Sequence, residues 1–197
     1  MNDQDFFNLT IILENNQVKL SPLMAEHFEN LLPIALEKSL WQFTTAKINS
    51  VADFKVYFDT ALLEKQQKKS YPFIIFDKIN NQYAGSTRFA NIDFKHKRTE
   101  IGWTWLRTSL HNTGFNRECK FLMLRYVFEK MLFNRVELKT NILNQRSQKA
   151  MRKLGAIEEG VFRKHSINDD GTVRDSMFFS FINDEWSFIK ENYFGGL

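Results

Sequence analysis

The sequence of 197 residues has little cysteine, little proline and no long apolar run. Its single cysteine, Cys119, excludes an intrachain disulfide framework and a cysteine-based zinc cluster, and it favours a reducing compartment. No apolar run approaches the ~20 residues of a membrane span, and the first ten residues lack the basic segment of a secretory signal. Four scattered histidines offer no metal-ligand spacing. We therefore expect a cytoplasmic protein with no membrane segment and no metal site.

Core-forming residues are plentiful, since hydrophobic residues make up 43% of the chain and include 20 phenylalanines. A chain of this length predicts one domain, residues 1–197, that buries roughly 70% of its unfolded surface. Residues 1–98 hold 12 basic and 11 acidic side chains, and residues 99–197 hold 15 and 12. The basic surplus of the second half indicates an anionic ligand there. Basic residues gather at turns and form no extended stripe, so we expect no nucleic acid as partner.

Hydrophobic periodicity predicts five helices and seven strands. Strands are expected over 8–20 (with a turn at 14–17), 71–76, 83–92, 100–106, 135–141, 157–167 and 173–182, and helices over 23–36, 51–64, 115–132, 145–154 and 183–192. Ser50 can cap the second helix, Gly155 can end the fourth, and Asp170-Gly171 indicates a hairpin between the last two strands. The order predicts a single-domain α/β (α+β) fold: a mixed, mostly antiparallel central sheet of about seven strands, with helices on both faces.

The segment between the strand 100–106 and the helix 115–132 has the features of a phosphate site. A helix N-terminus has free N–H groups and about half a positive charge. Gly114 lies just before this helix, and a backbone that must approach a phosphate has no room for a Cβ. Arg117 and Lys120 would reinforce the field. The segment is neither a Walker A loop nor a dinucleotide fingerprint, and a glycine before a helix is also an ordinary turn.

A second basic helix start follows the strand 135–141. The segment 144–153 contains Arg146, Lys149, Arg152 and Lys153 and no acid, and Asn144 can cap the helix. A solvated amphipathic helix would have the same pattern. Two basic helix starts after two neighbouring strands are less readily explained by chance than one.

Several short motifs follow one another along the chain. They are Glu100-Ile-Gly-Trp-Thr-Trp105, the loop His111–Asn116, Asn144-Gln-Arg-Ser147, Lys153-Leu-Gly-Ala156, Glu159-Gly160 and Gly171-Thr-Val-Arg-Asp175. Taken in this order, they resemble the GCN5-related N-acetyltransferase (GNAT) superfamily, most closely its RimJ/RimL branch of ribosomal-protein N-terminal acetyltransferases. The resemblance extends over nearly the whole chain, from about residue 9 to residue 186. The family's loop Gln/Arg-x-x-Gly-x-Gly/Ala is here His111-x-x-Gly114-x-Asn116, so Gly114 matches the pattern while His111 and Asn116 depart from it.

The resemblance implies acetyl-coenzyme A (acetyl-CoA) as cosubstrate and an amine as acceptor. The implied cofactor-binding residues fall into three groups along the molecule. The pyrophosphate would be held by the backbone amides of the loop and by Arg117 beside them, the loop residues being Asn112, Thr113, Gly114, Phe115 and Asn116. The pantetheine arm would pair, as an added strand, with Trp105, Leu106 and Arg107. The thioester would face Asn144 and Ser147, and the nucleotide would face Lys153.

Acetyl transfer to an amine needs a neutral amine, a stabilised oxyanion and a proton for the leaving thiolate. A backbone N–H of the central strand can supply the oxyanion contact. In the RimL-like pattern the Ser147 hydroxyl protonates the thiolate, although a helix-surface serine near a cap would have the same sequence. Glu100, at the start of the central strand, is the candidate base, and its alternative is a surface carboxylate at a strand end.

The acidity of the acceptor amine narrows the choice of substrate. An α-amino group with a pKa of about 7.7–8.0 is roughly one-tenth neutral at pH 7, and a lysine amine is neutral far less often. An enzyme without a strong base therefore suits a peptide N-terminus or a low-pKa small amine. We predict that a monomer or homodimer transfers acetyl from acetyl-CoA to such an amine by direct attack in a ternary complex. The alternative, which the departure at Asn116 favours, is a catalytically weak acyl-CoA-binding or sensing module.

Overall fold

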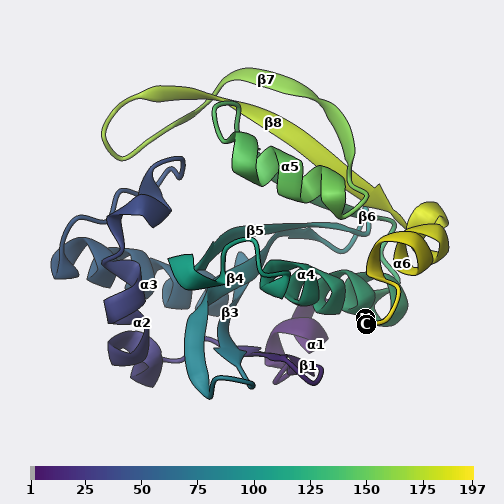
Figure 1. Ribbon diagram of the computed structural model, residues 1–197, viewed down its shortest axis with the longest axis horizontal. Coiled ribbons are helices and arrows are strands. Elements are labelled where there is room, and N and C mark those ends of the chain that lie inside the picture. Colours follow the sequence, from purple (N-terminus) through teal and green to yellow (C-terminus); the bar gives the residue numbers. More distant parts are fainter. Residues whose placement is uncertain (1–2) are drawn as a thin grey trace.

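One open sheet organises the molecule. The computed structural model describes residues 3–197, so residues 1 and 2 of the predicted domain lie outside the described part, and the domain's extent stays a prediction. Eight strands form the sheet in the order β1-β2-β3-β4-β5-β6-β8-β7 (Figure 1). They are β1 (Leu13–Glu14), β2 (Val18–Pro22), β3 (Ser70–Asp77), β4 (Gln82–Asp93), β5 (Arg98–Leu106), β6 (Arg135–Asn141), β7 (Ile157–Ile167) and β8 (Val173–Ile182).

The sheet has eight strands where about seven were predicted, because the expected strand 8–20 is a hairpin of two short strands. Its turn lies inside the predicted span 14–17. Asn15 Oδ1 accepts hydrogen bonds from the backbone N–H groups of Gln17 (3.0 Å) and Val18 (2.9 Å). This side chain therefore closes the turn between β1 and β2.

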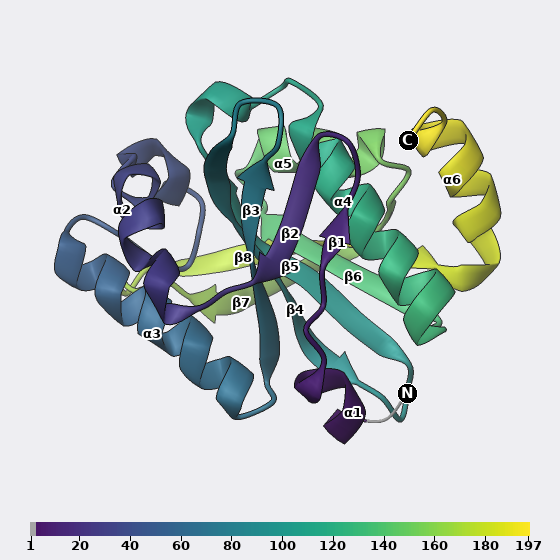
Figure 2. The same ribbon diagram turned by 90° about the horizontal axis from the view of Figure 1, so that it is seen from below.

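Helices cover both faces of the sheet, as predicted (Figure 2). They are α1 (Asp3–Asn8), α2 (Phe28–Ala35), α3 (Val51–Gln66), α4 (Phe115–Arg125), α5 (Gln145–Lys153) and α6 (Trp186–Phe194). Ser50 caps α3 as expected, since its side chain accepts from the Asp53 N–H at 3.2 Å. The predicted helix 115–132 is α-helical only to Arg125 and continues as a π-helix to Met131. The short helix α1 was not predicted.

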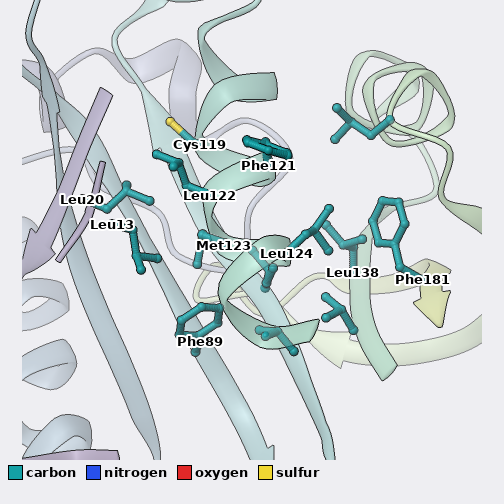
Figure 3. Packing of buried hydrophobic residues seen from close by; sticks show 14 of the residues in the cluster. Leu13, Leu20, Phe89, Cys119, Phe121, Leu122, Met123, Leu124, Leu138 and Phe181 are labelled. Atoms are coloured by element: carbon teal, nitrogen blue, oxygen red, sulfur yellow. The ribbon is translucent and has the colours of Figure 1, made fainter. Parts of the chain in front are cut away.

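Two hydrophobic clusters pack on opposite sides of the sheet. Alternation along β5 divides its last two residues between them, because Trp105 packs under α2 and α3 while Leu106 joins the cluster around α4. The helix α4 is buried on nearly all sides, and Figure 3 shows Cys119, Leu122 and Met123 facing the strands of the sheet. The first turns of α4 are therefore held rigidly against β5.

The strands β5 and β6 are the one parallel pair of the described sheet, and they pair only briefly. Their register has three residue pairs, from Arg98 opposite Arg135 to Glu100 opposite Glu137. Beyond these pairs β5 continues beside β4 to Leu106, and β6 continues beside β8 to Asn141. The facing edges of β5 and β6 are thus unpaired from residues 101 and 138 onward. We call this region the β5–β6 opening.

A close backbone approach and a bulge shape the β5 side of this opening. A Cβ on Gly85 of β4 would lie 2.0 Å from the Trp105 carbonyl oxygen, so only glycine fits there. The β4–β5 register shifts between Ser86 and Arg88, and Trp103 has a φ of 50°. A bulge of this kind leaves backbone groups outside the ladder at the point where the opening begins.

Candidate active site

The loop before α4 presents several free backbone donors at a helix N-terminus. Gly114 is the N-cap residue, with φ 91° and ψ −13°. Across residues 3–197, the amides of Asn112, Thr113, Gly114 and Asn116 donate to no protein group, whereas the Phe115 amide donates to Thr113 Oγ1 at 3.3 Å. Free amides that converge at the positive end of a helix form an anion site.

Backbone geometry, and not crowding, requires glycine at position 114. A Cβ built there would meet no atom within 4 Å, so the space beside the loop is open. The positive φ is strained for other residues, and a β-branched residue would be a clear outlier. Gly114 is therefore important because its positive φ sets the path of the backbone, and this path orients the neighbouring amide N–H groups.

The end of β5 offers its backbone and not its side chains to a ligand. Trp105 and Leu106 are each only 5% exposed. Arg107 is tied to the neighbouring strand end, because its guanidinium donates to Gln82 Oε1 at 2.5 Å and to the Tyr83 carbonyl at 2.6 Å. These contacts hold the end of the strand in place while its edge toward β6 stays unpaired.

The start of α5 lies across the β5–β6 opening and includes a free hydroxyl. Asn144 caps the helix as predicted, since Oδ1 accepts from the Ser147 N–H at 3.1 Å. Ser147 is half-buried, and its hydroxyl has no hydrogen-bond partner within the described chain. A half-buried hydroxyl without a protein partner is available to a ligand.

His111 links the two helix starts. Its Nε2 lies 3.1 Å from the Leu106 carbonyl oxygen, and its Nδ1 lies 3.0 Å from Arg146 Nη1. A carbonyl only accepts and a guanidinium only donates, so these contacts require the neutral tautomer with the proton on Nε2. Burial, with Arg146 beside the ring, lowers the pKa of His111 below 6.5 and favours that neutral form.

Three other basic or amide side chains named from the sequence lie in different surroundings. Asn116 has its Oδ1 buried with no partner among the described residues. The Arg117 Nε donates to the Tyr193 carbonyl of α6 at 2.8 Å, so this guanidinium packs against the C-terminal helix. Lys153 ends α5 and is exposed. Their roles toward a cofactor stay predictions.

Lys120 is the most unusual cation on this side of the molecule. It is 5% exposed, and its Nζ donates to Thr104 Oγ1 of β5 at 2.6 Å. No carboxylate in residues 3–197 forms an ion pair with it. Burial lowers the pKa of Lys120 to about 8. The sequence indicated Lys120 as a cation that would reinforce the field at the helix start, and the structure buries it beside the bulge of β5.

Glu100 lies at the last paired position between β5 and β6, and its carboxylate is held by two neighbours. Its Oε2 accepts from Lys139 Nζ at 2.9 Å and from Asn91 Nδ2 at 2.8 Å, and the residue is only 4% exposed. The exposed strand-end carboxylate that was its alternative is therefore wrong. Its role as general base stays a prediction.

A second group of side chains lies on the face opposite α4, and the sequence named only Glu100 among them as a candidate site residue. We call it the β8 cluster, and it comprises Glu100, Lys139, His165, Arg174, Ser176 and Phe178. Met177 and Phe179 of β8 point into the main core, so the residues that alternate with them form this opposite face.

His165 belongs to this cluster because of a bulge in β7. Phe162 pairs with Ser176, and Ser166 pairs with Arg174, so three β7 residues lie opposite one β8 residue. Lys164, within the bulge, has a φ of 50°. Simple alternation would place His165 on the face away from Phe162, but the bulge returns it to the same face.

The imidazole of His165 is held by its neighbours in the β8 cluster. Its Nδ1 lies 3.1 Å from Ser176 Oγ, and its ring centroid lies 5.1 Å from that of Phe178. Partial burial, followed by the positive charges of Lys139 and Arg174, lowers its pKa below 6.5. The lowered pKa favours the neutral imidazole, which can accept a proton.

No group of three or more His, Cys, Asp or Glu side chains in residues 3–197 could hold a metal ion. Among the helices in that range, none is long and apolar enough to cross a bilayer.

The sequence is similar to known acetyltransferases. The profile of the family described as "Acetyltransferase (GNAT) domain" matches residues 17–157. YdaF of Bacillus subtilis (strain 168), whose name assigns it provisionally to the ribosomal N-acetyltransferases, is 26% identical over 102 residues, 52% of this chain and 55% of its own. YnaD of the same organism, named an uncharacterized N-acetyltransferase, is 28% identical over 88 residues, 45% of this chain and 51% of its own. The chain thus spans about half the length of the curated relatives that it matches.

Solved structures resemble this one over most of the chain. A GCN5-related N-acetyltransferase from Brucella melitensis matches with a TM-score of 0.85 and 26% identity, over 94% of this chain and 88% of that one. The Salmonella typhimurium acetyltransferase that modifies the N-terminal serine of 50S ribosomal subunit protein L7/L12 matches with a TM-score of 0.76 and 20% identity, over 87% of this chain and 99% of that one. At 20% identity the likeness shows the fold alone.

Proposed function

Because the chain belongs to the acetyltransferase (GNAT) domain family and is an acyltransferase, we propose that it transfers acetyl from acetyl-CoA to a primary amine by direct attack in a ternary complex. The acceptor is a peptide N-terminus or a small-molecule amine. One observation carries the proposal: the starts of α4 and α5 flank the unpaired edges of β5 and β6. A cytoplasmic location, a monomeric or dimeric state and the lack of a nucleic-acid partner stay predictions.

The residues at the β5–β6 opening fit acetyl-CoA. Four free amides from Asn112 to Asn116 suit a pyrophosphate, and the unpaired edge of β5 at Trp105 and Leu106 suits the amides of a pantetheine arm. The path of the loop at Gly114 leaves open space beside these donors. When bound, acetyl-CoA supplies an activated acyl group and a thiol leaving group.

Two side chains are placed to move protons on either side of this opening. The free hydroxyl of Ser147 can give a proton to the departing sulfur. The neutral imidazole of His165 can take a proton from the acceptor ammonium, directly or through one water. The backbone freed by the bulge at Trp103 can donate to the oxyanion. We assign to Glu100 the electrostatic attraction of the ammonium, since Lys139 and Asn91 already hold its carboxylate.

A coupled assay tests the proposal directly. The purified protein is mixed with acetyl-CoA and a panel of peptides and small amines, thiol release is followed, and mass spectrometry locates the acetyl group. We expect release that depends on the amine, and calorimetry should show coenzyme A binding. Binding without release across the panel would support the sensing module instead, and absence of binding would contradict both functions.

A further inference from the structure

Arg174 of β8 has a guanidinium that the described chain leaves partly unsatisfied. Its Nη1 donates to the Phe43 carbonyl at 3.0 Å, while its Nε is buried with no hydrogen-bond partner. No carboxylate among residues 3–197 lies in ion-pair contact with it. The side chain as a whole is only partly buried and its guanidinium has no counter-ion in the described chain, so the guanidinium can still contact a carboxylate from outside.

Other cations near this face have carboxylate partners of their own. Arg88 contacts Glu64 at 2.7 Å, and Lys139 contacts Glu100 at 2.9 Å. Burial lowers the pKa of Arg174, and the charge of Glu100 acts in the opposite direction from beyond contact distance. An added carboxylate at Arg174 would therefore be favourable and would displace no internal ion pair.

The position of Arg174 is fixed by a bridge across the molecule. The tip of the β7–β8 hairpin binds the segment between α2 and α3, because the Asp169 N–H donates to the Thr45 carbonyl at 3.0 Å and Lys47 Nζ lies 3.7 Å from Asp170. Arg174 joins the same bridge through Phe43. A guanidinium anchored at one nitrogen loses little further entropy when a carboxylate binds its remaining donors.

We propose that Arg174 binds a carboxylate of the acceptor, so that the substrate class is a primary amine that also carries a carboxylate. This inference rests on the proposed acetyl transfer and adds a specificity residue to it. Glu100 attracts the ammonium, His165 accepts its proton, and Arg174 holds the carboxylate on the same face. The guanidinium fork suits bidentate recognition of a carboxylate.

The carboxylate has two possible chemical sources, which differ in their distance from the amine. Arg174 and Ser176, the partner of His165, are two residues apart on β8, which is about 7 Å along a strand. A free amino acid has its carboxylate closer to its amine than this, whereas the side chain of an acidic second residue in a peptide reaches that far. Both sources share the chemistry that Arg174 would recognise, and the substrates below separate them.

Matched substrates test the inference. One arm compares kcat/KM for two peptides that begin Ser-Glu and Ser-Gln and are otherwise identical, and the other compares serine with serinamide. A charge-assisted hydrogen bond predicts a preference for the charged partner of about tenfold to hundredfold in one arm. A preference for the Ser-Glu peptide identifies the side chain of an acidic second residue as the source of the carboxylate. A preference for serine over serinamide identifies the carboxylate of a free amino acid. In Arg174→Met the preference should fall to within about twofold, and Arg174→Lys should keep part of it.

A binding measurement and a control variant separate recognition from fold and from general charge. N-acetylated Ser-Glu peptide should bind the protein more tightly than its Ser-Gln counterpart in calorimetry, and Arg174→Met should remove the difference. Arg163→Met removes an exposed positive charge from the adjacent strand and should keep the preference. Thermal melting checks that each variant is folded. Amine acetylation with no preference in either arm would overturn the inference and leave the proposed function intact, whereas absence of acetylation would contradict the function itself.

Discussion

The two sides of the candidate site are built from different parts of the chain. The cofactor side uses backbone: four free amides in one continuous loop, an unpaired strand edge and a capped helix start. The acceptor side uses side chains from separate strands, brought together in the β8 cluster. Backbone sites suit a ligand that is the same for every member of a family. Side-chain sites can be changed residue by residue, so they are suited to selecting the acceptor.

Charge is also handled differently on the two sides. Lys120 on the cofactor side is buried with one hydrogen bond and no carboxylate in the described chain, and its pKa is about 8. On the acceptor side Lys139 contacts Glu100 directly. Burial of Lys120 therefore costs free energy that no ion pair offsets, whereas on the acceptor side Lys139 is paired with a carboxylate and Arg174 is not. Four predictions follow from this contrast, in order of decreasing effect.

The largest effect concerns the stability of Lys120→Met. The folded pKa of about 8 lies below the ordinary 10.5, so the unfolded chain binds more protons between these values, and stability should rise with pH there. The penalty is fully present below pH 8 and is roughly 3 kcal/mol. Lys120→Met should therefore be more stable than the wild type at pH 7 by up to that amount, and the difference should shrink toward pH 10. Urea unfolding at several pH values measures it, and a difference independent of pH would contradict the prediction.

The next effect concerns catalysis at the start of α5. Ser147→Ala should lower kcat by about a hundredfold, the ordinary size of a general-acid contribution, with the Kd for coenzyme A within about twofold. Ser187→Ala, an exposed serine early in α6, is the matched control and should keep full activity. An unchanged kcat in Ser147→Ala would show that water or another group protonates the sulfur.

A third prediction concerns the backbone of the cofactor side. Gly114→Val forces a β-branched residue into φ 91° and should weaken coenzyme A binding by about thirtyfold, equivalent to about 2 kcal/mol of strain or displaced amides. Gly171→Val imposes similar strain at φ 79° in the β7–β8 hairpin and should leave coenzyme A affinity unchanged. Equal losses of coenzyme A affinity in both variants, measured by calorimetry, would mean that general destabilisation is responsible and not the loss of the backbone donors in the loop before α4.

The smallest effect is expected on the acceptor side. The pKa of His165 lies below 6.5, so kcat/KM should fall as pH drops through that region and the base becomes protonated. His165→Gln should move this acidic limb up to the pKa of the amine itself, about 7.7–8.0, and lower kcat/KM at pH 7 by only about tenfold, because roughly a tenth of an α-amine is neutral already. His96→Gln changes an exposed histidine far along the chain and should keep the limb. An acidic limb that stays below pH 6.5 in His165→Gln would assign the base elsewhere.

Much of the cofactor side could be predicted because its signals are local. Gly114 before a helix and Asn144 as an N-cap are decided by a few neighbouring residues, and the structure confirms both local geometries. The order of strands and helices followed from periodicity, except that the Asn15 turn divides the first strand into two and that the short helix α1 was not predicted. The surroundings of individual side chains did not follow from local pattern, since Lys120 was expected only to reinforce the field at the helix start and lies buried beside Thr104.

The sequence by itself determined the elements, both helix caps at the site and the glycine that aims the loop, because hydrogen bonds and backbone preferences over a few residues fix these features. Only the tertiary structure decided which side chains meet on the acceptor side. A bulge in β7 reverses the facing of His165, and Arg174 finds Phe43 more than a hundred residues away. Strand register and long-range contacts depend on the packing of the whole sheet, and no local pattern records them.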